Sequence, residues 1–129
     1  MGFDEMDVGT IWQDGDFVDW DDATVHVLTH ALHYGTGIFE GVRCYDTENG
    51  PAIFRWDEHL DRFYQSAKPY DMEVPFSREE LTEATLELLR REELRSCYIR
   101  PVAFYGYGSL GVSPKENPVN AAIAAWPWG

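Results

Sequence analysis

Two side chains near position 100 are suited to binding a carboxylate. Tyr98 and Arg100 lie in a run of aromatic and β-branched residues, 96–107, that predicts a strand. Because side chains alternate between the two faces of a strand, this hydroxyl and this planar cation share one face. A guanidinium can bind a carboxylate through two parallel hydrogen bonds. The alternative is a surface arginine that pairs with one of the many acidic residues of the chain.

A similar face is expected from Phe39-Glu40-Gly41-Val42-Arg43. In a strand, Phe39, Gly41 and Arg43 point to the same side. A glycine between an aromatic residue and a cation weakens strand packing unless something must approach the backbone closely. The segment therefore indicates contact with a flat ligand, or alternatively a β-bulge.

Three glycines imitate a dinucleotide-binding motif. Gly106, Gly108 and Gly111 have the spacing of the fingerprint and follow a predicted strand. The pyrophosphate needs a helix N-terminus directly after the glycines, and Pro114 and Pro118 prevent such a helix. We therefore expect no nucleotide site here.

Three histidines imitate a metal site. His26, His30 and His33 would share one face of a helix, as metal ligands can. Their segment contains β-branched residues and two glycines, so it is a poor helix former and the spacing need not hold in space. We expect histidines that form hydrogen bonds or lie in the core, and no metal.

The elements that must position these residues begin with two hairpins. Asp14-Gly15 joins the aromatic and β-branched runs 10–12 and 17–20, and Asn49-Gly50 joins 38–45 to 52–56. Both dipeptides favour tight turns between strands. Two long strands are predicted near the end of the sequence, 96–107 and 120–126, with a loop rich in glycine and proline between them, 108–118.

Two amphipathic helices are expected between the hairpins and the long strands. After Asp57, apolar residues recur with helical spacing and Pro69 stops the helix: Leu60, Phe63, Tyr64 and Ala67. Ser77 and Glu80 are spaced as a capping box before a second helix that contains Leu81, Ala84, Leu88 and Leu89. Arg62 lies at the edge of the first apolar face, where an arginine usually snorkels to solvent.

The order of these elements predicts an α+β fold, a mostly antiparallel sheet with two main helices. We expect residues 1–129 to form one domain, because 129 residues can bury one core but hardly two.

The charge of the chain excludes two classes of partner. Asp and Glu number 23 against 10 Lys and Arg, which gives a net charge of −13. Nucleic acid and anionic membranes would repel such a protein. Lysine occurs only as Lys68 and Lys115, so the surface is acidic and lysine-poor. High ionic strength would screen the repulsion among the carboxylates, and we therefore expect a halophilic protein.

Cysteine content and the first residues indicate a cytoplasmic protein. Cys44 and Cys97 are too few for a disulfide framework, and both are expected to act as small core residues. Residues 1–13 lack the features of a signal peptide, and no apolar stretch approaches the length of a membrane span.

The stretch His30-Ala31-Leu32-His33-Tyr34-Gly35-Thr36-Gly37-Ile38-Phe39-Glu40-Gly41-Val42-Arg43 closely resembles branched-chain amino acid aminotransferases, of the fold-type IV class of pyridoxal-phosphate enzymes. The resemblance covers nearly the whole chain, from about Ile11 to Gly129, in order and with compatible spacing. It continues through Phe54-Arg55, Glu58-His59, Arg62, Ser66-Ala67-Lys68, Tyr98-Ile99-Arg100-Pro101, Gly111-Val112 and Ala124-Ala125-Trp126-Pro127-Trp128-Gly129. D-amino acid transaminases and aminodeoxychorismate lyases share the fold but resemble this chain less around residues 39–43.

The resemblance implies the fold of the small N-terminal domain of such an enzyme, with pyridoxal 5'-phosphate as cofactor. The family passes the amino group of leucine, isoleucine or valine to 2-oxoglutarate, and the cofactor serves as the electron sink. Arg62 matches the arginine that holds the cofactor phosphate. Tyr98 matches a residue near the substrate α-carboxylate, and Arg100 matches the arginine for the side-chain carboxylate of glutamate.

The remaining matches concern the substrate pocket and a partner subunit. Walls of the pocket for the branched aliphatic chain are matched by Phe39, Gly41 and Trp128. Arg43 matches an arginine close to the site. Tyr34 and Val112 match positions that the family lends to the partner subunit's site, which implies a homodimer.

The catalytic lysine of the family lies in a second, larger domain, after the Trp-Gly with which this sequence ends. Neither Lys68 nor Lys115 matches it, and both are expected to be exposed. We therefore expect no catalytic residue in this chain and no activity of the chain alone. The alternative is a freestanding, non-catalytic module with the same fold that acts through protein–protein contact.

Overall fold

A largely antiparallel sheet is the framework of the computed structural model, which describes residues 2–128. Its strands are β1 (Thr10–Gln13), β2 (Asp16–Asp19), β3 (Gly37–Phe39), β4 (Val42–Thr47), β5 (Gly50–Ile53), β6 (Cys97–Tyr105) and β7 (Val119–Pro127). Their order across the sheet is β2-β1-β7-β6-β4-β5, and β3 pairs with β6 in line with β4. Each of these pairings is antiparallel.

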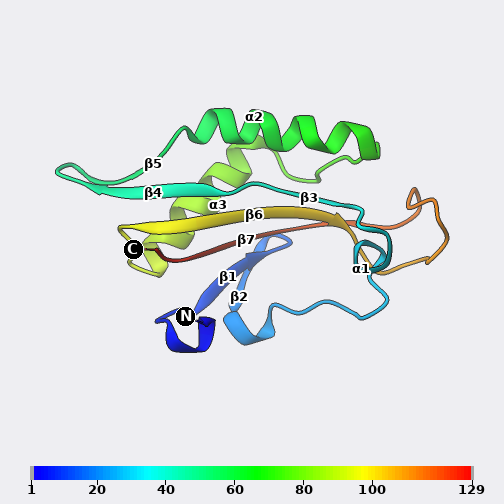
Figure 1. Cartoon of the computed structure of the whole chain (residues 1–129), viewed down its shortest axis with the longest axis horizontal. Helices are drawn as coiled ribbons and strands as arrows, with labels where there is room; N and C mark the ends of the chain where they lie inside the picture. The colour runs from blue at the N-terminus through cyan, green and yellow to red at the C-terminus, as the bar shows by residue number, and fades with distance from the viewer. Residues whose placement is uncertain (1, 129) are drawn as a thin grey trace.

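Two helices, α2 (Trp56–Ala67) and α3 (Arg78–Arg91), cover one face of this sheet (Figure 1). Both begin and end close to the predicted positions, and the α+β class is confirmed. The capping box is confirmed as well, because Ser77 Oγ accepts from the Glu80 N–H while Glu80 Oε1 accepts from the Ser77 N–H. Shorter turns are α1 (His30–Tyr34) and the 3-10 segments η1 (Phe3–Glu5), η2 (Trp20–Asp22) and η3 (Lys68–Tyr70).

The strand predicted for residues 38–45 is interrupted rather than continuous. The partners run on without a shift from Phe39 opposite Val102 to Val42 opposite Ile99, so no extra residue is inserted and the bulge interpretation is wrong. Glu40 N–H donates to the carbonyl of Pro101, but Pro101 has no N–H to return a bond. The ladder is therefore broken between β3 and β4 while the two segments stay in line.

The histidine segment also differs from the prediction, because one helical turn forms at α1. The turn ends where Gly35 adopts a left-handed conformation, with φ of 68°, and its N–H donates to the Ala31 carbonyl. Trp56 starts α2 instead of ending a strand, and its indole N–H donates to Thr82 Oγ1 on α3 at 2.9 Å. Contacts with other parts of the chain determine both the turn at α1 and the start of α2. Local residue preferences cannot predict such contacts.

The core lies between the sheet and the two helices. Alternate residues of β6 point toward it, among them Cys97, Ile99 and Ala103, where they meet Phe63 of α2 and Leu88 of α3 in one buried cluster. Cys97 lies opposite Cys44 in the register, and both are free and buried, as expected for small core residues. Burial, followed by the neighbouring Cys44 thiol, raises the pKa of Cys97 to about 12.

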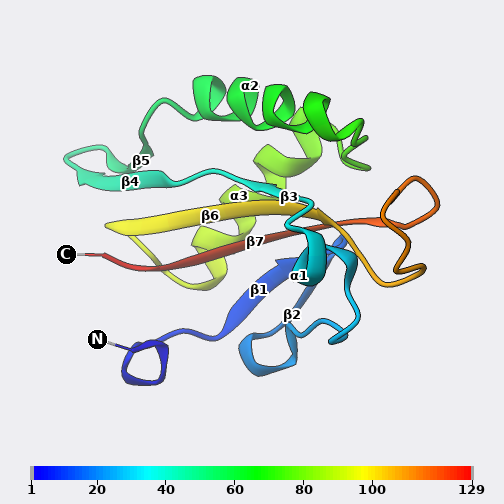
Figure 2. The ribbon, with the colours of Figure 1, turned by 45° about the vertical axis from the view of Figure 1, so that its right-hand side comes forward.

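The other residues of β6 point to the opposite face, which α2 and α3 leave open (Figure 2). Tyr98 and Arg100 belong to this open face, together with Trp126 of β7. Of the helices in residues 2–128, none has the length and apolar character needed to cross a membrane.

Candidate functional site

The open face of the sheet brings together Tyr98, Arg100 and Gly41. One Nη2–H of Arg100 donates to the Tyr98 hydroxyl at 3.2 Å. A Cβ atom at position 41 would overlap the Tyr98 hydroxyl and would lie 2.9 Å from its Cζ atom. Gly41 is thus a position where another group approaches the backbone closely, and that group is a tyrosine of the chain itself.

Arg100 is held by aromatic rings rather than by an acid. Its guanidinium carbon lies 4.3 Å from the ring centroid of Phe39, whose side chain is exposed on the same face. The Nε atom of Arg100 is buried and has no hydrogen-bond partner among residues 2–128. No ion pair of Arg100 occurs in this part of the chain either, which contradicts the interpretation as an ordinary surface ion pair.

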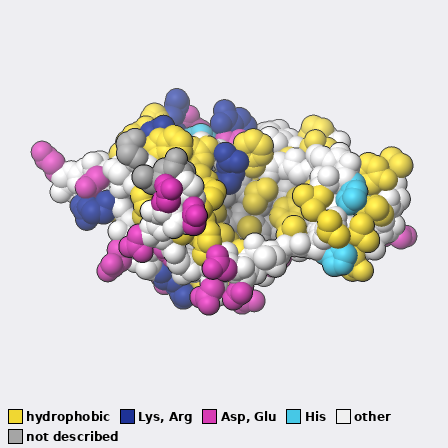
Figure 3. All heavy atoms as spheres, turned by 60° about the horizontal axis from the view of Figure 1, so that its bottom comes forward, with side chains coloured by type: hydrophobic (Ala, Val, Ile, Leu, Met, Phe, Trp, Pro, Cys, Tyr) yellow, Lys and Arg dark blue, Asp and Glu magenta, His cyan; other side chains and the backbone are white. Residues whose placement is uncertain are grey.

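A row of aromatic side chains extends this face from β6 to the end of β7. Tyr98 packs against Trp126 and Trp128, with ring centroids 5.1 and 5.3 Å apart. The guanidinium carbon of Arg43, which lies opposite Tyr98 in the register, is 5.2 Å from the Trp128 ring. Figure 3 shows this side of the molecule, where hydrophobic side chains and cations lie next to one another. The face can therefore bind an aliphatic group and an anion side by side.

Arg62 lies on the helix side of the sheet, bound to a buried carboxylate. Its Nε–H and Nη2–H donate to Glu40 at 2.9 and 2.7 Å, and His59 Nδ1 lies 2.8 Å from the same carboxylate. Burial acts to raise the pKa of Glu40, but the hydrogen bonds and charges of Arg62 and His59 outweigh it and hold this pKa below its ordinary value. Arg62 reaches solvent as expected, with 66% of its side chain exposed, and it also forms a specific ion pair with Glu40.

The open face and the Arg62–Glu40 pair both involve residues 39–41, but they lie on opposite faces of the sheet. Phe39 and Gly41 take part in the open face, whereas Glu40 between them points toward α2. Arg62, the predicted cofactor residue, therefore contacts Glu40 from the helix side, whereas the predicted substrate residues on either side of Glu40, Phe39 and Gly41, belong to the open face.

Tyr34 and Val112 lie at a third place, the end of the sheet formed by α1 and the loop before β7. The Tyr34 hydroxyl donates to the Leu110 carbonyl at 2.9 Å, and Val112 is 79% exposed. His30 fastens the same loop, because its ring nitrogens lie 2.8 Å from Thr36 Oγ1 and from the Gly111 carbonyl. Several large hydrophobic side chains are exposed here: Val25, Val27, Leu28, Leu32 and Leu110. Figure 3 shows hydrophobic side chains gathered beside histidines at one end of the molecule.

The chain matches the model of the Amino-transferase class IV family over residues 37–129. It belongs to that family. Relatives within the family include the branched-chain-amino-acid aminotransferase of Pseudomonas aeruginosa, which is 53% identical over 121 residues, 94% of this chain and 39% of the relative.

Solved structures give the same relationship. A T.th. branched-chain amino acid aminotransferase with pyridoxamine 5'-phosphate superimposes with a TM-score of 0.92 at 54% identity, over 97% of this chain and 41% of the other. The same enzyme complexed with N-(5'-phosphopyridoxyl)-L-glutamate gives a TM-score of 0.92 at 54% identity, over 96% and 42%. The chain thus spans about two fifths of the length of these family members.

Within the candidate site, Glu40 and His59 were not predicted as functional residues. A signal for Glu40 existed, because strand alternation that places Phe39, Gly41 and Arg43 on one face puts Glu40 on the other, buried face. A buried carboxylate needs a cationic partner. The identity of that partner depends on how α2 lies on the sheet, which the sequence pattern does not give.

The histidines and glycines that imitate other motifs have local roles. His26 Nδ1 accepts from the Leu28 N–H, and His33 Nε2 lies 2.9 Å from the Val27 carbonyl, so the expectation of hydrogen-bonded histidines is confirmed. Residues 106–111 lead into a loop, and no helix lies between β6 and β7, all of whose connecting residues the structure describes. Lys68 and Lys115 are exposed, as expected.

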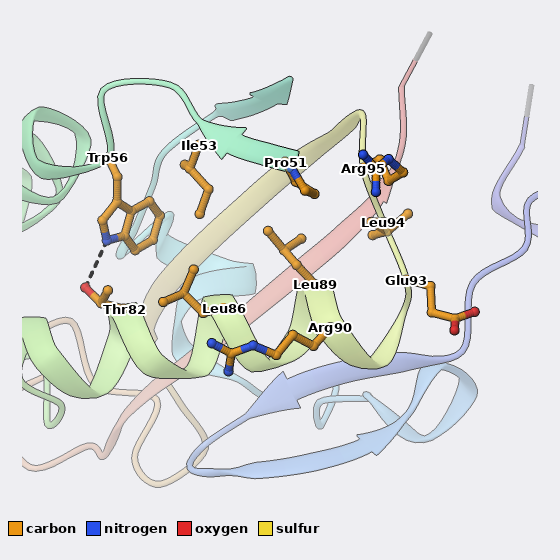
Figure 4. Close-up of a pocket in the computed structure, with 10 residues that line it drawn as sticks. All are labelled: Pro51, Ile53, Trp56, Thr82, Leu86, Leu89, Arg90, Glu93, Leu94 and Arg95. Carbon is orange, nitrogen blue, oxygen red and sulfur yellow. Dashed lines mark hydrogen bonds between the residues drawn. The ribbon is translucent and has the colours of Figure 1, made fainter. Parts of the chain in front are cut away.

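A separate groove of about 660 Å³ lies on the helix side, between β5 and α3 (Figure 4). Ile53, Leu86 and Leu89 form its apolar floor, and Arg90 and Arg95 line it as well. These arginines are already paired, with Glu87 and with Asp46. The groove shares no residue with the open face or with Arg62, so it is separate from the candidate site.

Proposed function

We propose that this chain is the N-terminal part of a branched-chain amino acid aminotransferase that transfers the amino group of leucine, isoleucine or valine to 2-oxoglutarate. The observation that carries the proposal is the 53% sequence identity, over 94% of this chain, with the branched-chain-amino-acid aminotransferase of Pseudomonas aeruginosa. The relatives are longer, and we propose that activity requires residues beyond these 129, including the lysine that carries the cofactor. The isolated chain is then inactive.

Pyridoxal 5'-phosphate is the proposed cofactor, and the residues present fit its phosphate. Arg62 is held in a fixed orientation by Glu40, while its side chain remains 66% exposed and free to meet an anion. When bound, this cofactor supplies an electron sink for the carbanion formed in transamination. The part of this chain is to bind and orient, and the remainder of the cofactor site belongs to the rest of the protein.

The open face is the proposed substrate wall. Tyr98 would meet the α-carboxylate and Arg100 the side-chain carboxylate of glutamate or 2-oxoglutarate. A single pocket must accept an apolar leucine side chain and an anionic glutamate side chain, so its cation must lie at the rim. Two observations support Arg100 for this role: its guanidinium packs on Phe39, and its buried Nε–H has no partner in the described chain.

The other assignments follow the same proposal. Phe39, Gly41 and Trp128 would form walls for the branched chain, and Arg43 would lie close to the site over Trp128. Tyr34 and Val112 would reach the site of a second subunit in a homodimer, from the end of the sheet that exposes large hydrophobic side chains. The proposed enzyme is halophilic and cytoplasmic, and it binds neither nucleic acid nor membranes. The acidic composition of the chain supports this proposal.

A chimaera tests the proposal. This chain replaces the matched segment of the Pseudomonas aeruginosa aminotransferase, and glutamate formation from leucine and 2-oxoglutarate is measured. We expect leucine-dependent activity, and loss of that activity without loss of folding when Tyr98→Phe and Arg100→Leu are combined. A chimaera that folds and retains cofactor but is inactive would favour the non-catalytic module instead.

A further inference from the structure

Glu40 is a carboxylate in the interior of the molecule, with 5% of its side chain exposed. It belongs to the short interruption between β3 and β4 and points toward α2. Such a group is costly to bury unless it is paired and hydrogen-bonded. Within the described chain, its carboxylate contacts come from two residues of α2, His59 and Arg62.

The contacts with Arg62 are directional. The Nε–H donates to Oε2 and the Nη2–H to Oε1, so one edge of the planar guanidinium meets the two carboxylate oxygens in parallel. His59 Nδ1 approaches Oε1 from the preceding turn of α2. The two Arg62 contacts define the plane of the guanidinium and the direction of its remaining edge, and the His59 contact holds the carboxylate that accepts them.

An exposed arginine without such a partner has many rotamers and loses their entropy when it binds. The Arg62 side chain is 66% exposed, yet one edge of its guanidinium is fixed. It lines a hollow of about 120 Å³ with Arg55, Glu58 and His59, large enough for a phosphate-sized anion. The negative charge of Glu40 opposes an anion there, so its contribution must be orientation rather than charge.

We propose that Glu40 and His59 are positioning residues that fix the Arg62 guanidinium for a phosphate group. The proposal rests on the proposed function, in which that group is the cofactor phosphate. Glu40 acts through Arg62 and does not touch the ligand. A preorganised guanidinium offers two donors at a set geometry. It should therefore bind phosphate, which can accept both hydrogen bonds, in preference to a spherical anion such as chloride.

A purely structural role would use the same contacts to attach α2 to β3, so stability alone does not separate the two roles. Selectivity between anions does. Removing the Glu40 charge raises the affinity for both anions, and more for phosphate, because phosphate carries more negative charge than chloride; this electrostatic effect alone would raise phosphate selectivity. Loss of orientation lowers the affinity for phosphate alone, so a fall in the ratio of phosphate to chloride affinity must come from lost positioning.

The experiment uses the full 129-residue chain, with inorganic phosphate and chloride as probes at constant ionic strength. The Arg62 Nε–H resonance reports anion binding. The rate at which this N–H exchanges with water reports how firmly Glu40 holds the guanidinium. Glu40→Gln keeps the size of the side chain and removes its charge, and Glu87→Gln removes an exposed carboxylate of another ion pair as the matched control. We expect phosphate selectivity to fall about tenfold in Glu40→Gln, the loss of one charge-assisted contact, and Nε–H exchange to accelerate. Glu87→Gln should behave as the unmodified chain.

His59→Asn keeps the experiment decisive if Glu40→Gln does not fold, because it removes one contact and leaves the Glu40–Arg62 pair. It should reduce selectivity in the same direction by a smaller factor. The proposal is overturned if folded Glu40→Gln shows unchanged Arg62 Nε–H exchange and unchanged phosphate selectivity. If only His59→Asn folds, the same result in that variant overturns it. So does an unmodified chain without phosphate selectivity. If Arg62→Gln retains full phosphate selectivity, the phosphate role of Arg62 in the proposed function is wrong. That result is distinct from failure of the positioning proposal, which is tested by the Glu40 and His59 variants.

Discussion

The hydroxyl of Tyr98 occupies the space that a Cβ atom of residue 41 would need, so Gly41 and Tyr98 fit each other across the interruption between β3 and β4. The interval from residue 41 to residue 98 contains both main helices, and the register of β4 on β6 brings the two residues together. The same tyrosine hydroxyl accepts the hydrogen bond from Arg100. A change at position 41 must therefore displace a group that orients the candidate carboxylate-binding arginine.

Gly41→Ala should lower the free energy of unfolding by about 1–3 kcal/mol, as overpacking typically does. Tyr98→Phe in the same chain should recover part of that loss, because the overlapping oxygen is removed while the ring carbon at 2.9 Å remains. Urea unfolding of the two single variants and the double variant measures the coupling. Gly111→Ala is the control, since the nearest atom to its Cβ position is Ser109 Oγ at 3.6 Å. Additive effects of the two changes would show that the overlap is relieved elsewhere.

Sequence patterns predicted the parts of this fold that depend on local spacing. The capping box of α3, the Asp14-Gly15 and Asn49-Gly50 turns and the alternation along β6 all follow from neighbouring residues. The break at Glu40 was missed because it arises from Pro101, more than sixty residues away in the sequence. The turn at α1 was missed because His30 is held by Thr36 and by the Gly111 carbonyl, contacts that residue preferences do not contain.

The candidate site shows the same division. Strand alternation placed Tyr98 with Arg100 and Phe39 with Gly41, and the structure places these four on one face. The pairing of Arg62 with Glu40 was not predicted, because it depends on the height and direction of α2 above the sheet. Helix-on-sheet geometry is set by the packed core as a whole, and a periodic pattern records only which side is buried.

Acid should weaken the unmodified chain more than it weakens Glu40→Gln. Burial raises the pKa of Glu40, the contacts with Arg62 and His59 outweigh it, and the net pKa lies below the ordinary value of 4.5. A carboxyl whose pKa is lowered in the folded state stabilises the fold above the unfolded pKa, and this contribution is lost as the pH falls through the folded pKa. The difference in unfolding free energy between the two chains should shrink as the pH falls below the ordinary Glu40 pKa value of 4.5.

Glu87 provides the comparison for this measurement. The pKa of Glu87 is lowered as well, through a hydrogen bond from Arg91 that outweighs burial, but its ion pairs are on the surface. Solvent screens such pairs, so Glu87→Gln should show a much smaller dependence on pH over the same range. An equal or larger effect at Glu87 would contradict the importance of burial at Glu40.

Potassium chloride should raise the melting temperature of the chain. The net charge of −13 destabilises the compact state through self-repulsion, and salt screens charges that lie more than about 10 Å apart at 0.1 M. The increase should be largest at low salt and should be the same for sodium chloride, because screening depends on ionic strength. Sucrose at matched osmolality is the control. A melting temperature that stays flat or falls with potassium chloride would count against the halophilic interpretation.

Arg100→Leu, made in the chimaera, separates recognition of the glutamate side chain from recognition of the α-carboxylate. If Arg100 contacts only the side-chain carboxylate, the reaction with glutamate should lose about 1.5–3 kcal/mol, roughly ten- to more than a hundredfold in specificity constant. Leucine has no carboxylate at that position, so its half-reaction should be nearly unchanged, and the substituted aliphatic side chain can still pack on Phe39. Single-turnover measurements with leucine and with glutamate, each against the pyridoxal form, give the two values separately. Equal losses for both substrates would mean that Arg100 binds the α-carboxylate they share, and the assignment to the side chain would be wrong.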